Sequence, residues 1–268
     1  MRVCDMKVVL TGASGGIGLE LAEQLCAEGA RVLGVSRHPG VLTKLMDQYP
    51  QQLAWHGADL RTREGRQSVL VAAQALGGVN ALINAAGVNR FALFDQVDAD
   101  SLDNLLDINL KAPMQLTHLL LPLLREQPSA LVVNIGSIYG SIGYPGYAPY
   151  SASKFALRGF TEALRRELAD TSVEVIYAAP RATRTAMNSS AAVELNQSLK
   201  VGMDDPADVA RAVLDAVQNQ RSELYLGWPE KLFVRLNGLL PRLVDRALRK
   251  QLPLIRRYSD INNKAYSK

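Results

Sequence analysis

The sequence is poor in the residues that build disulfide and metal sites. Its 268 residues include only two cysteines, Cys4 and Cys26, and three widely separated histidines, His38, His56 and His118. A disulfide framework or a metal-ligand cluster needs a denser pattern. We therefore expect neither a structural disulfide nor a metal site, and a reducing cytoplasm suits the chain.

Long apolar runs are lacking as well. No run reaches the ~18 residues that cross a bilayer, and the amino terminus passes almost directly into a predicted strand. We therefore expect neither a membrane span nor a signal peptide. The content of 48% hydrophobic and 21% charged residues is instead typical of a globular protein.

Positive charge is scarce outside the carboxyl-terminal segment. Residues 229–258 hold eight Lys or Arg and two Asp or Glu, a net charge of +6, whereas the whole chain carries +4. The other residues together therefore carry −2. Because basic residues do not recur along the body of the chain, we do not expect a groove for nucleic acid.

Short apolar segments alternate with helical patterns through the first 226 residues. The predicted strands cover residues 6–11, 31–36, 53–57, 79–84, 130–136, 173–178 and 223–226, and the predicted helices cover 17–28, 62–76, 101–124, 150–169 and 206–219. Strands that are apolar on both faces are typical of a parallel sheet covered by helices. Such a doubly wound α/β sheet binds ligands at the carboxyl ends of its strands. We predict one catalytic domain over residues 1–228 and a basic helical extension over 229–268.

A glycine-rich segment, TGASGGIG at residues 11–18, joins the first predicted strand to the first predicted helix. Glycines at such a turn let main-chain N–H groups approach a pyrophosphate at the helix N-terminus. The spacing is G-x-x-x-G-x-G rather than the G-x-G-x-x-G of the standard dinucleotide fingerprint. The residues predicted to hold the cofactor phosphates are Gly12, Ser14, Gly15, Gly16, Ile17 and Gly18.

The second predicted strand ends at Ser36 and Arg37, where an acidic residue would favour the free ribose hydroxyls of NADH. A guanidinium is suited to a phosphate. We therefore predict NADPH or NADP+ as the cofactor in preference to NADH; the alternative is that Arg37 is only a surface residue. Further predicted cofactor contacts stand at the ends of the third and fourth strands: Asp59, Leu60, Asn84, Ala85 and Gly87.

Tyr150 and Lys154 stand four residues apart, so on a helix they share one face. An ammonium beside a phenol favours phenolate, so we expect the pKa of Tyr150 to be lowered towards neutral pH, which would make the pair an acid–base catalyst. Ser137 closes the fifth predicted strand. Asn109 is unusual inside a long predicted helix, because Asn competes there for main-chain hydrogen bonds.

TGASGGIG at 11–18, NAAG at 84–87, Asn109, Ser137 and YSASK at 150–154 together resemble the short-chain dehydrogenase/reductase family. The resemblance covers about residues 6–226. It implies a Rossmann-like, seven-stranded parallel sheet and a homodimer or homotetramer formed through long helices. It also implies that Tyr150 exchanges a proton with the substrate oxygen, that Ser137 hydrogen-bonds that oxygen, and that Lys154 binds the nicotinamide ribose. Asn109 would hold a water that extends the proton path from Lys154.

The segment after the sixth predicted strand departs from the family pattern, which is Pro-Gly followed by a threonine. Here Pro180, Thr183 and Thr185 are predicted cofactor contacts, but Arg181 replaces the glycine. Because arginine adopts a positive φ only at a cost, this loop could run differently. Arg181 could face the pyrophosphate, face an acidic substrate, or lie on the surface.

Two apolar segments suggest the substrate. The family resemblance implies that residues 187–203 form a flexible lid over the substrate, and the apolar residues in this segment suggest an apolar covering. Residues 138–147 should line the same pocket unless they belong to the core. These features favour a hydrophobic ketone or acyl substrate. In residues 232–248, apolar residues recur at helical spacing between basic ones, and Gly238 and Pro241 should divide two helices. This basic amphipathic tail could contact an anionic membrane, its own core or a second subunit.

We therefore predict an NADPH-dependent oxidoreductase that transfers hydride between nicotinamide and a small-molecule carbonyl or alcohol. A 3-oxoacyl-thioester reductase is the alternative among enzymes, although the short carboxyl terminus of that type differs from this long tail. An NADP(H)-sensing protein and a membrane-surface protein are the non-catalytic alternatives. The presence of Ser137, Tyr150 and Lys154 argues against a sensor, which needs no proton donor.

Overall fold

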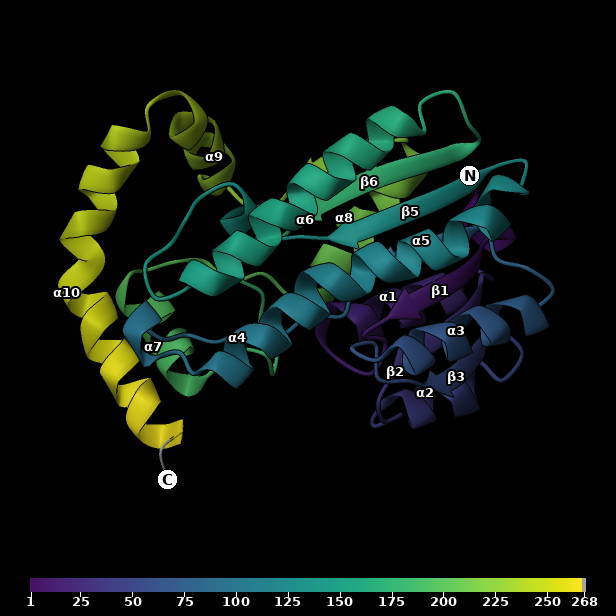
Figure 1. The fold of residues 1–268 in the computed structure, drawn as a ribbon, viewed down its shortest axis with the longest axis horizontal. Coiled ribbons are helices and arrows are strands. Elements are labelled where there is room, and N and C mark those ends of the chain that lie inside the picture. The colour runs from purple at the N-terminus through teal and green to yellow at the C-terminus, as the bar shows by residue number, and fades with distance from the viewer. Residues whose placement is uncertain (267–268) are drawn as a thin grey trace.

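A single seven-stranded parallel sheet forms the centre of the molecule, with strand order β3-β2-β1-β4-β5-β6-β7 (Figure 1). The computed structural model describes residues 1–266, so the last two residues of the predicted extension lie outside it. The strands are β1 Lys7–Thr11, β2 Arg31–Ser36, β3 Leu53–Gly57, β4 Ala81–Asn84, β5 Ala130–Ile135, β6 Val173–Ala179 and β7 Glu223–Tyr225. This order confirms the predicted doubly wound, Rossmann-like sheet.

Helices cover both faces of the sheet. Successive side chains of a strand point to opposite faces, and here both faces carry apolar side chains that the helices bury. Val8 and Leu10 pack with α1, α2 and α8, whereas Val9 packs with α3, α5 and α6. The helices are α1 Gly16–Ala27, α2 Leu42–Gln48, α3 Arg63–Ala75, α4 Ala99–Leu106, α5 Ala112–Arg125, α6 Ala148–Glu167, α7 Ser190–Ser198, α8 Pro206–Gln218, α9 Glu230–Leu239 and α10 Pro241–Tyr266. The core is therefore two apolar layers, one on each side of the sheet.

Short polar side chains mark where several helices begin. The Thr62 hydroxyl accepts from the Gly65 N–H at the start of α3, and the Asp98 carboxylate accepts from the Ser101 N–H at the start of α4. Asp205 caps α8 in the same way, with Pro206 at its first position. Each cap satisfies a main-chain donor that the helix leaves unpaired.

The structure differs from the predicted helices in three places. The helix expected over 101–124 is interrupted by a π-helical turn at Asp107–Lys111, where the Ala112 N–H donates to the carbonyl five residues earlier. The seven-residue α2 was not predicted, and helix α7 occupies the segment expected to be a flexible lid; Ser189 caps it. The tail is divided into two helices at Pro241, as predicted, whereas Gly238 lies inside α9.

The tail packs on its own core. Ile255 of α10 is fully buried with Phe91, Tyr147 and Leu195, and Figure 1 shows α10 passing beside α7. Two hydrogen bonds attach it further: the Leu93 N–H donates to Ser259 Oγ at 2.9 Å, and Asn262 Nδ2 donates to the Phe91 carbonyl at 2.6 Å. No helix in the described part of the chain is long and apolar enough to cross a membrane.

Candidate active site

A cleft of about 780 Å³ lies at the carboxyl ends of the strands and collects most of the predicted site residues. Its lining includes Gly12, Ser14, Gly15, Gly16, Ile17, Ser36, Arg37, Asp59, Leu60, Ala85, Gly87, Ser137, Tyr150, Lys154, Pro180, Thr183 and Thr185. Three predicted site residues, Gly18, Asn84 and Asn109, lie outside this lining. The cleft brings together segments from both ends of the chain.

The glycine turn forms a cradle, which larger residues at the same positions would obstruct. Gly12 has a φ of +70°, and a Cβ there would lie 2.8 Å from the main chain of Ala86. Gly16 also has a positive φ, whereas a Cβ on Gly15 would meet open space. A Cβ on Gly18 would collide with the carbonyl oxygen of Gly12, so this glycine holds α1 close to β1. The turn therefore fits a pyrophosphate lying against main-chain N–H groups at the start of α1.

The end of β2 presents a cation to the cleft. Arg37 lines it and makes no hydrogen bond or ion pair with residues 1–266. Ser36 is more constrained, because its hydroxyl donates to the His38 carbonyl at 2.7 Å and accepts from Trp55 Nε1 at 3.0 Å. Ser36 therefore shapes the loop that carries Arg37. Its hydroxyl has one lone pair left, so in the predicted cofactor contact Ser36 could only accept a hydrogen bond.

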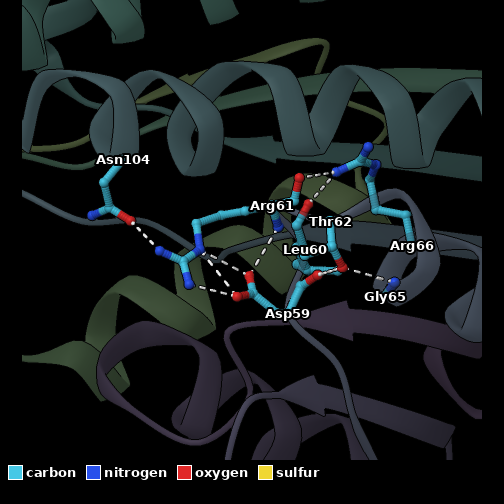
Figure 2. Close-up of polar contacts among 7 residues, drawn as sticks. All are labelled: Asp59, Leu60, Arg61, Thr62, Gly65, Arg66 and Asn104. Carbon is cyan, nitrogen blue, oxygen red and sulfur yellow. Dashed lines mark hydrogen bonds and ion pairs between the residues drawn. The ribbon is translucent and has the colours of Figure 1, made fainter. Parts of the chain in front are cut away.

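The loop after β3 is held by two arginines (Figure 2). Arg61 Nη2 donates to Asp59 Oδ2 at 2.6 Å, and its Nη1 reaches Asn104 Oδ1 at 3.3 Å. The Arg61 guanidinium lowers the pKa of the Asp59 carboxyl. Asp59 is therefore ionised, and its negative charge is paired with the positive charge of Arg61. Arg66 Nη1 donates to the carbonyls of Leu60 and Arg61. The predicted cofactor contact of Asp59 must accordingly compete with its partner Arg61, which the sequence did not reveal.

Tyr150 and Lys154 lie on the first turns of α6, with Lys154 Nζ 5.7 Å from the centroid of the Tyr150 ring. Burial raises the pKa of Tyr150 to about 12, and a hydrogen bond with Ser137 opposes the shift. The predicted lowering by Lys154 is therefore wrong for this structure, because desolvation of the phenolate outweighs the distant ammonium. Burial also lowers the pKa of Lys154 to about 8, and its Nζ donates to the Ile135 carbonyl at 3.0 Å.

Ser137 follows β5 and is positioned by Tyr177, a buried residue of β6. The Tyr177 hydroxyl donates to the Ser137 carbonyl at 3.2 Å and accepts from the Ser137 N–H at 3.4 Å. A Cβ on Gly136 or Gly140 would collide with this side chain, so those glycines make room for it. The Ser137 hydroxyl accepts from the Tyr139 N–H at 3.1 Å and also hydrogen-bonds the Tyr150 hydroxyl, so the two hydroxyls lie together in the cleft. The sequence offered no signal for Tyr177 beyond its apolar strand.

Asn84 and Asn109 support the cleft from behind. Asn84 Nδ2 donates to Asn134 Oδ1 at 2.8 Å and to Thr117 Oγ1 at 3.3 Å, so Asn84 joins β4 to β5 and α5 instead of lining the cofactor side. Asn109 lies in the π-helical turn, and its amide exchanges hydrogen bonds with the Val88 main chain at 2.8 and 2.9 Å. This pairing explains Asn inside a helix; its predicted role with water stays a prediction.

Arg181 lines the cleft, but its guanidinium is already paired with acidic side chains of the protein. Its side chain bonds Asp204 Oδ1 at 2.7 Å and Glu230 Oε2 at 3.3 Å, and it is only 20% exposed. Gly202 and Gly227 make room for it, since a Cβ on Gly227 would lie 2.5 Å from Arg181 Cδ. The described backbone shows no positive φ at Arg181. The arginine therefore joins the loop after β6 to the start of α9, and the sequence separation concealed this contact.

The substrate end of the cleft is aromatic and is closed by the tail. Tyr139 stacks on Tyr144 with ring centroids 5.0 Å apart, and Tyr147 lies 6.3 Å from the catalytic candidate Tyr150. The tail contributes Phe233, Val244, Ala247, Leu248 and Gln251 to the lining. Gln251 accepts a hydrogen bond from the Tyr144 hydroxyl at 2.8 Å. The tail is therefore one wall of the cleft, which its amphipathic pattern alone did not reveal.

Known proteins share this architecture. A ketoacyl reductase of Nostoc, HetN, is 32% identical over 253 residues, which cover 90% of this chain and 88% of HetN. The crystal structure of a short-chain dehydrogenase from Streptomyces avermitilis has a TM-score of 0.78 at 30% identity and covers 94% of this chain and 98% of its own. The fold is also shared, at 23% identity, by two Burkholderia short-chain dehydrogenases. The one from B. phymatum, in complex with NAD, has a TM-score of 0.81 and covers 91% of this chain and 96% of its own. The one from B. cenocepacia, in complex with NADP, has a TM-score of 0.79 and covers 92% and 99%.

The family model described as short chain dehydrogenase matches residues 6–196, from the first strand to within α7. This range contains the glycine turn, the end of β2, Ser137, and the Tyr150–Lys154 pair. The chain therefore belongs to the short-chain dehydrogenase family and is an NAD(P)-dependent oxidoreductase.

Proposed function

We propose that this protein is an NADPH-dependent reductase of hydrophobic carbonyl compounds that also catalyses the reverse oxidation of the alcohols. The observation that carries the proposal is the convergence of Ser137, Tyr150 and Lys154 with the glycine turn in one cleft. A proton donor and a nucleotide cradle in the same cavity are what hydride transfer to a carbonyl requires.

The cofactor would lie along the carboxyl edge of the sheet. Its pyrophosphate fits the cradle of Gly12, Gly15 and Gly16, and its nicotinamide ribose fits beside Lys154. A bound nicotinamide would supply the hydride. Gly87 lines this end of the cleft, and a Cβ there would lie 3.8 Å from Lys154 Nζ, so its main chain is next to the lysine.

Tyr150 would donate the proton to the substrate oxygen. With a pKa of about 12 the phenol is protonated throughout the neutral range, which suits the direction of carbonyl reduction. The Ser137 hydroxyl would donate to the same oxygen, and the Lys154 ammonium would supply the proton that replaces the one Tyr150 gives up. The surrounding tyrosines exclude water from the reacting carbonyl.

The preference for NADPH rests on the charges at the adenosine end. Arg37 has no ion-pair partner among the described residues, whereas Asp59 is already neutralised by Arg61. A 2′-phosphate would therefore meet a guanidinium that no hydrogen bond or ion pair among the described residues holds. Arg37→Asp should weaken NADPH binding on the order of 10–100-fold relative to NADH, because it replaces a charge-assisted contact with a repulsion. Fluorescence titration with both nucleotides measures this ratio, and an unchanged ratio refutes the assignment.

An acyl thioester is the second substrate candidate. The similarity to the ketoacyl reductase HetN favours it, and it shares with a ketone the carbonyl that Ser137 and Tyr150 would bind. The apolar tail wall would accept either an acyl chain or a hydrophobic ketone.

The experiment that tests the proposal is NADPH oxidation across ketones, quinones, steroids and 3-oxoacyl thioesters. Tyr150→Phe should lower kcat by on the order of 100–10,000-fold, because it removes the general acid, while leaving the dissociation constant of NADPH nearly unchanged. If the wild-type protein binds NADPH but oxidises it with no member of the panel, it is a nucleotide sensor and not this reductase.

A further inference from the structure

Exposed apolar side chains are concentrated where the tail turns. The described residues contain thirteen large hydrophobic residues that are exposed, and six of these lie within residues 228–243. We call five of them the α9–α10 ridge: Trp228, Leu232, Leu239, Leu240 and Leu243. Leu239 is 79% and Trp228 is 72% exposed, and α9 buries none of its residues. A patch of this kind marks an interaction surface.

The two helices that carry the ridge also carry unpaired positive charge. The eight Lys and Arg between residues 229 and 258 are all exposed, and none forms an ion pair with residues 1–266. Of the two acidic residues in the same range, Glu230 is bonded to Arg181 and only Asp245 is exposed. The two helices therefore combine exposed apolar side chains with exposed, unpaired cations.

The geometry points to an anionic lipid bilayer as the occupant of this surface, and we propose that the α9–α10 ridge docks the protein on membranes. Apolar side chains would enter the boundary between headgroups and acyl chains, and Lys and Arg would contact the lipid phosphates. A second copy of this chain fits less well, because a two-fold contact would press two segments of net charge +6 against each other.

The ridge also adjoins the mouth of the cleft. Phe233, which follows Leu232 in α9, lines the cleft and is 42% exposed. Val244 and Leu248 line the cleft from α10. The two helices thus present one side to the substrate pocket and the other to the proposed bilayer. A carbonyl compound dissolved in lipid would have a short path to Tyr150, a consequence that depends on the proposed function, whereas the docking does not.

Vesicle flotation of the full-length protein tests the docking. Vesicles of phosphatidylcholine with about 30% phosphatidylglycerol should carry the protein, and phosphatidylcholine alone should carry on the order of tenfold less or lower. Salt at about 0.5 M should weaken the binding through screening. Arg242→Gln with Arg246→Gln should lower the partition coefficient about 25-fold, which corresponds to ~1 kcal/mol for each basic residue. The matched control, Arg31→Gln with Lys44→Gln, removes two exposed charges elsewhere and should bind like wild type.

Leu239→Asp with Leu240→Asp should abolish flotation, whereas Val71→Asp, at an exposed apolar residue of α3, should not. Neither leucine lines the cleft, so NADPH binding in both variants reports that the fold is intact. Absence of flotation on anionic vesicles, or equal flotation of the Leu239/Leu240 and Val71 variants, overturns the proposal. A dimer in solution that these leucine substitutions dissociate, without vesicle binding, assigns the ridge to a second copy instead.

Discussion

The two ends of the cleft are built in different ways. The cofactor end uses main-chain segments that directly follow β1, β2, β3 and β4, and its shape depends on glycines such as Gly12 and Gly18. The substrate end is assembled by side chains from distant parts of the chain, as the contacts of Arg181 with Glu230 and of Tyr144 with Gln251 show. Few substitutions would be tolerated at the cofactor end, because main-chain contacts fix its shape. At the substrate end, the replacement of a few side chains would be enough to change which substrate fits.

Substitution of Gly18 should break the cofactor end. Gly18→Ala would drive a methyl group into the Gly12 carbonyl, and we expect the free energy of unfolding to fall by about 3 kcal/mol as α1 is displaced. Gly15→Ala is the control, because its Cβ meets open space and its backbone is extended; it should change stability by less than about 0.5 kcal/mol. Urea unfolding compares the two. Equal losses would show that the turn is not closely packed against α1.

The pH dependence should be common to all substrates, because Lys154 belongs to the cofactor end. Burial lowers the pKa of Lys154 to about 8, so its ammonium is present below that pH and is lost above it, while Tyr150, at about 12, keeps its proton. We expect kcat/KM for reduction to fall about tenfold per pH unit above pH ~8, for small and large carbonyls alike.

Lys154→Arg provides the control for this profile. A guanidinium stays charged, so any activity that the variant keeps should show no break near pH 8. A wild-type profile that is flat to pH ~10 would contradict the role of the ammonium.

Arg181 should separate the two ends. Arg181→Ala removes the bonds to Asp204 and Glu230, and we expect KM for large hydrophobic ketones to rise roughly tenfold, as the loss of about 1.4 kcal/mol in positioning α9 implies. Small aldehydes and NADPH should be affected less than about twofold. Arg184→Ala is the matched control, because Arg184 lies on the same loop as Arg181 but pairs with Asp205, at the start of α8, and not with a residue of the tail. An equal effect of both substitutions would place Arg181 among ordinary surface residues.

Tyr177 should give the smallest effect. Tyr177→Phe removes the hydroxyl that bonds both main-chain groups of Ser137, so kcat should fall about threefold to tenfold while the dissociation constant of NADPH stays the same. Tyr225→Phe removes a neighbouring hydroxyl that bonds Ser141 instead, and it should leave kcat unchanged. A change in NADPH affinity with constant kcat would exclude a positioning role.

The sequence predicted what depends on local pattern. Short apolar segments located all seven strands, and residues of the segments at 11–18 and 150–154 line one cleft. It did not predict contacts between distant side chains, such as Tyr177 with Ser137 or Arg181 with Glu230, because no local period encodes them. The expected pKa shift of Tyr150 failed for the same reason, since the dominant cause is burial by residues that only the fold brings near.

The attachment of α10 to Phe91 and Leu93 also has a consequence for synthesis. Ser259 and Asn262 bond main-chain groups more than 160 residues earlier in the chain. A ribosome releases the glycine turn and the central strands long before these residues leave it, so the nucleotide cradle can form on the nascent chain while the substrate wall waits for the last helix. A chain that ends before α10 would be expected to form the glycine turn and the sheet, but the substrate end of its cleft would be open to water.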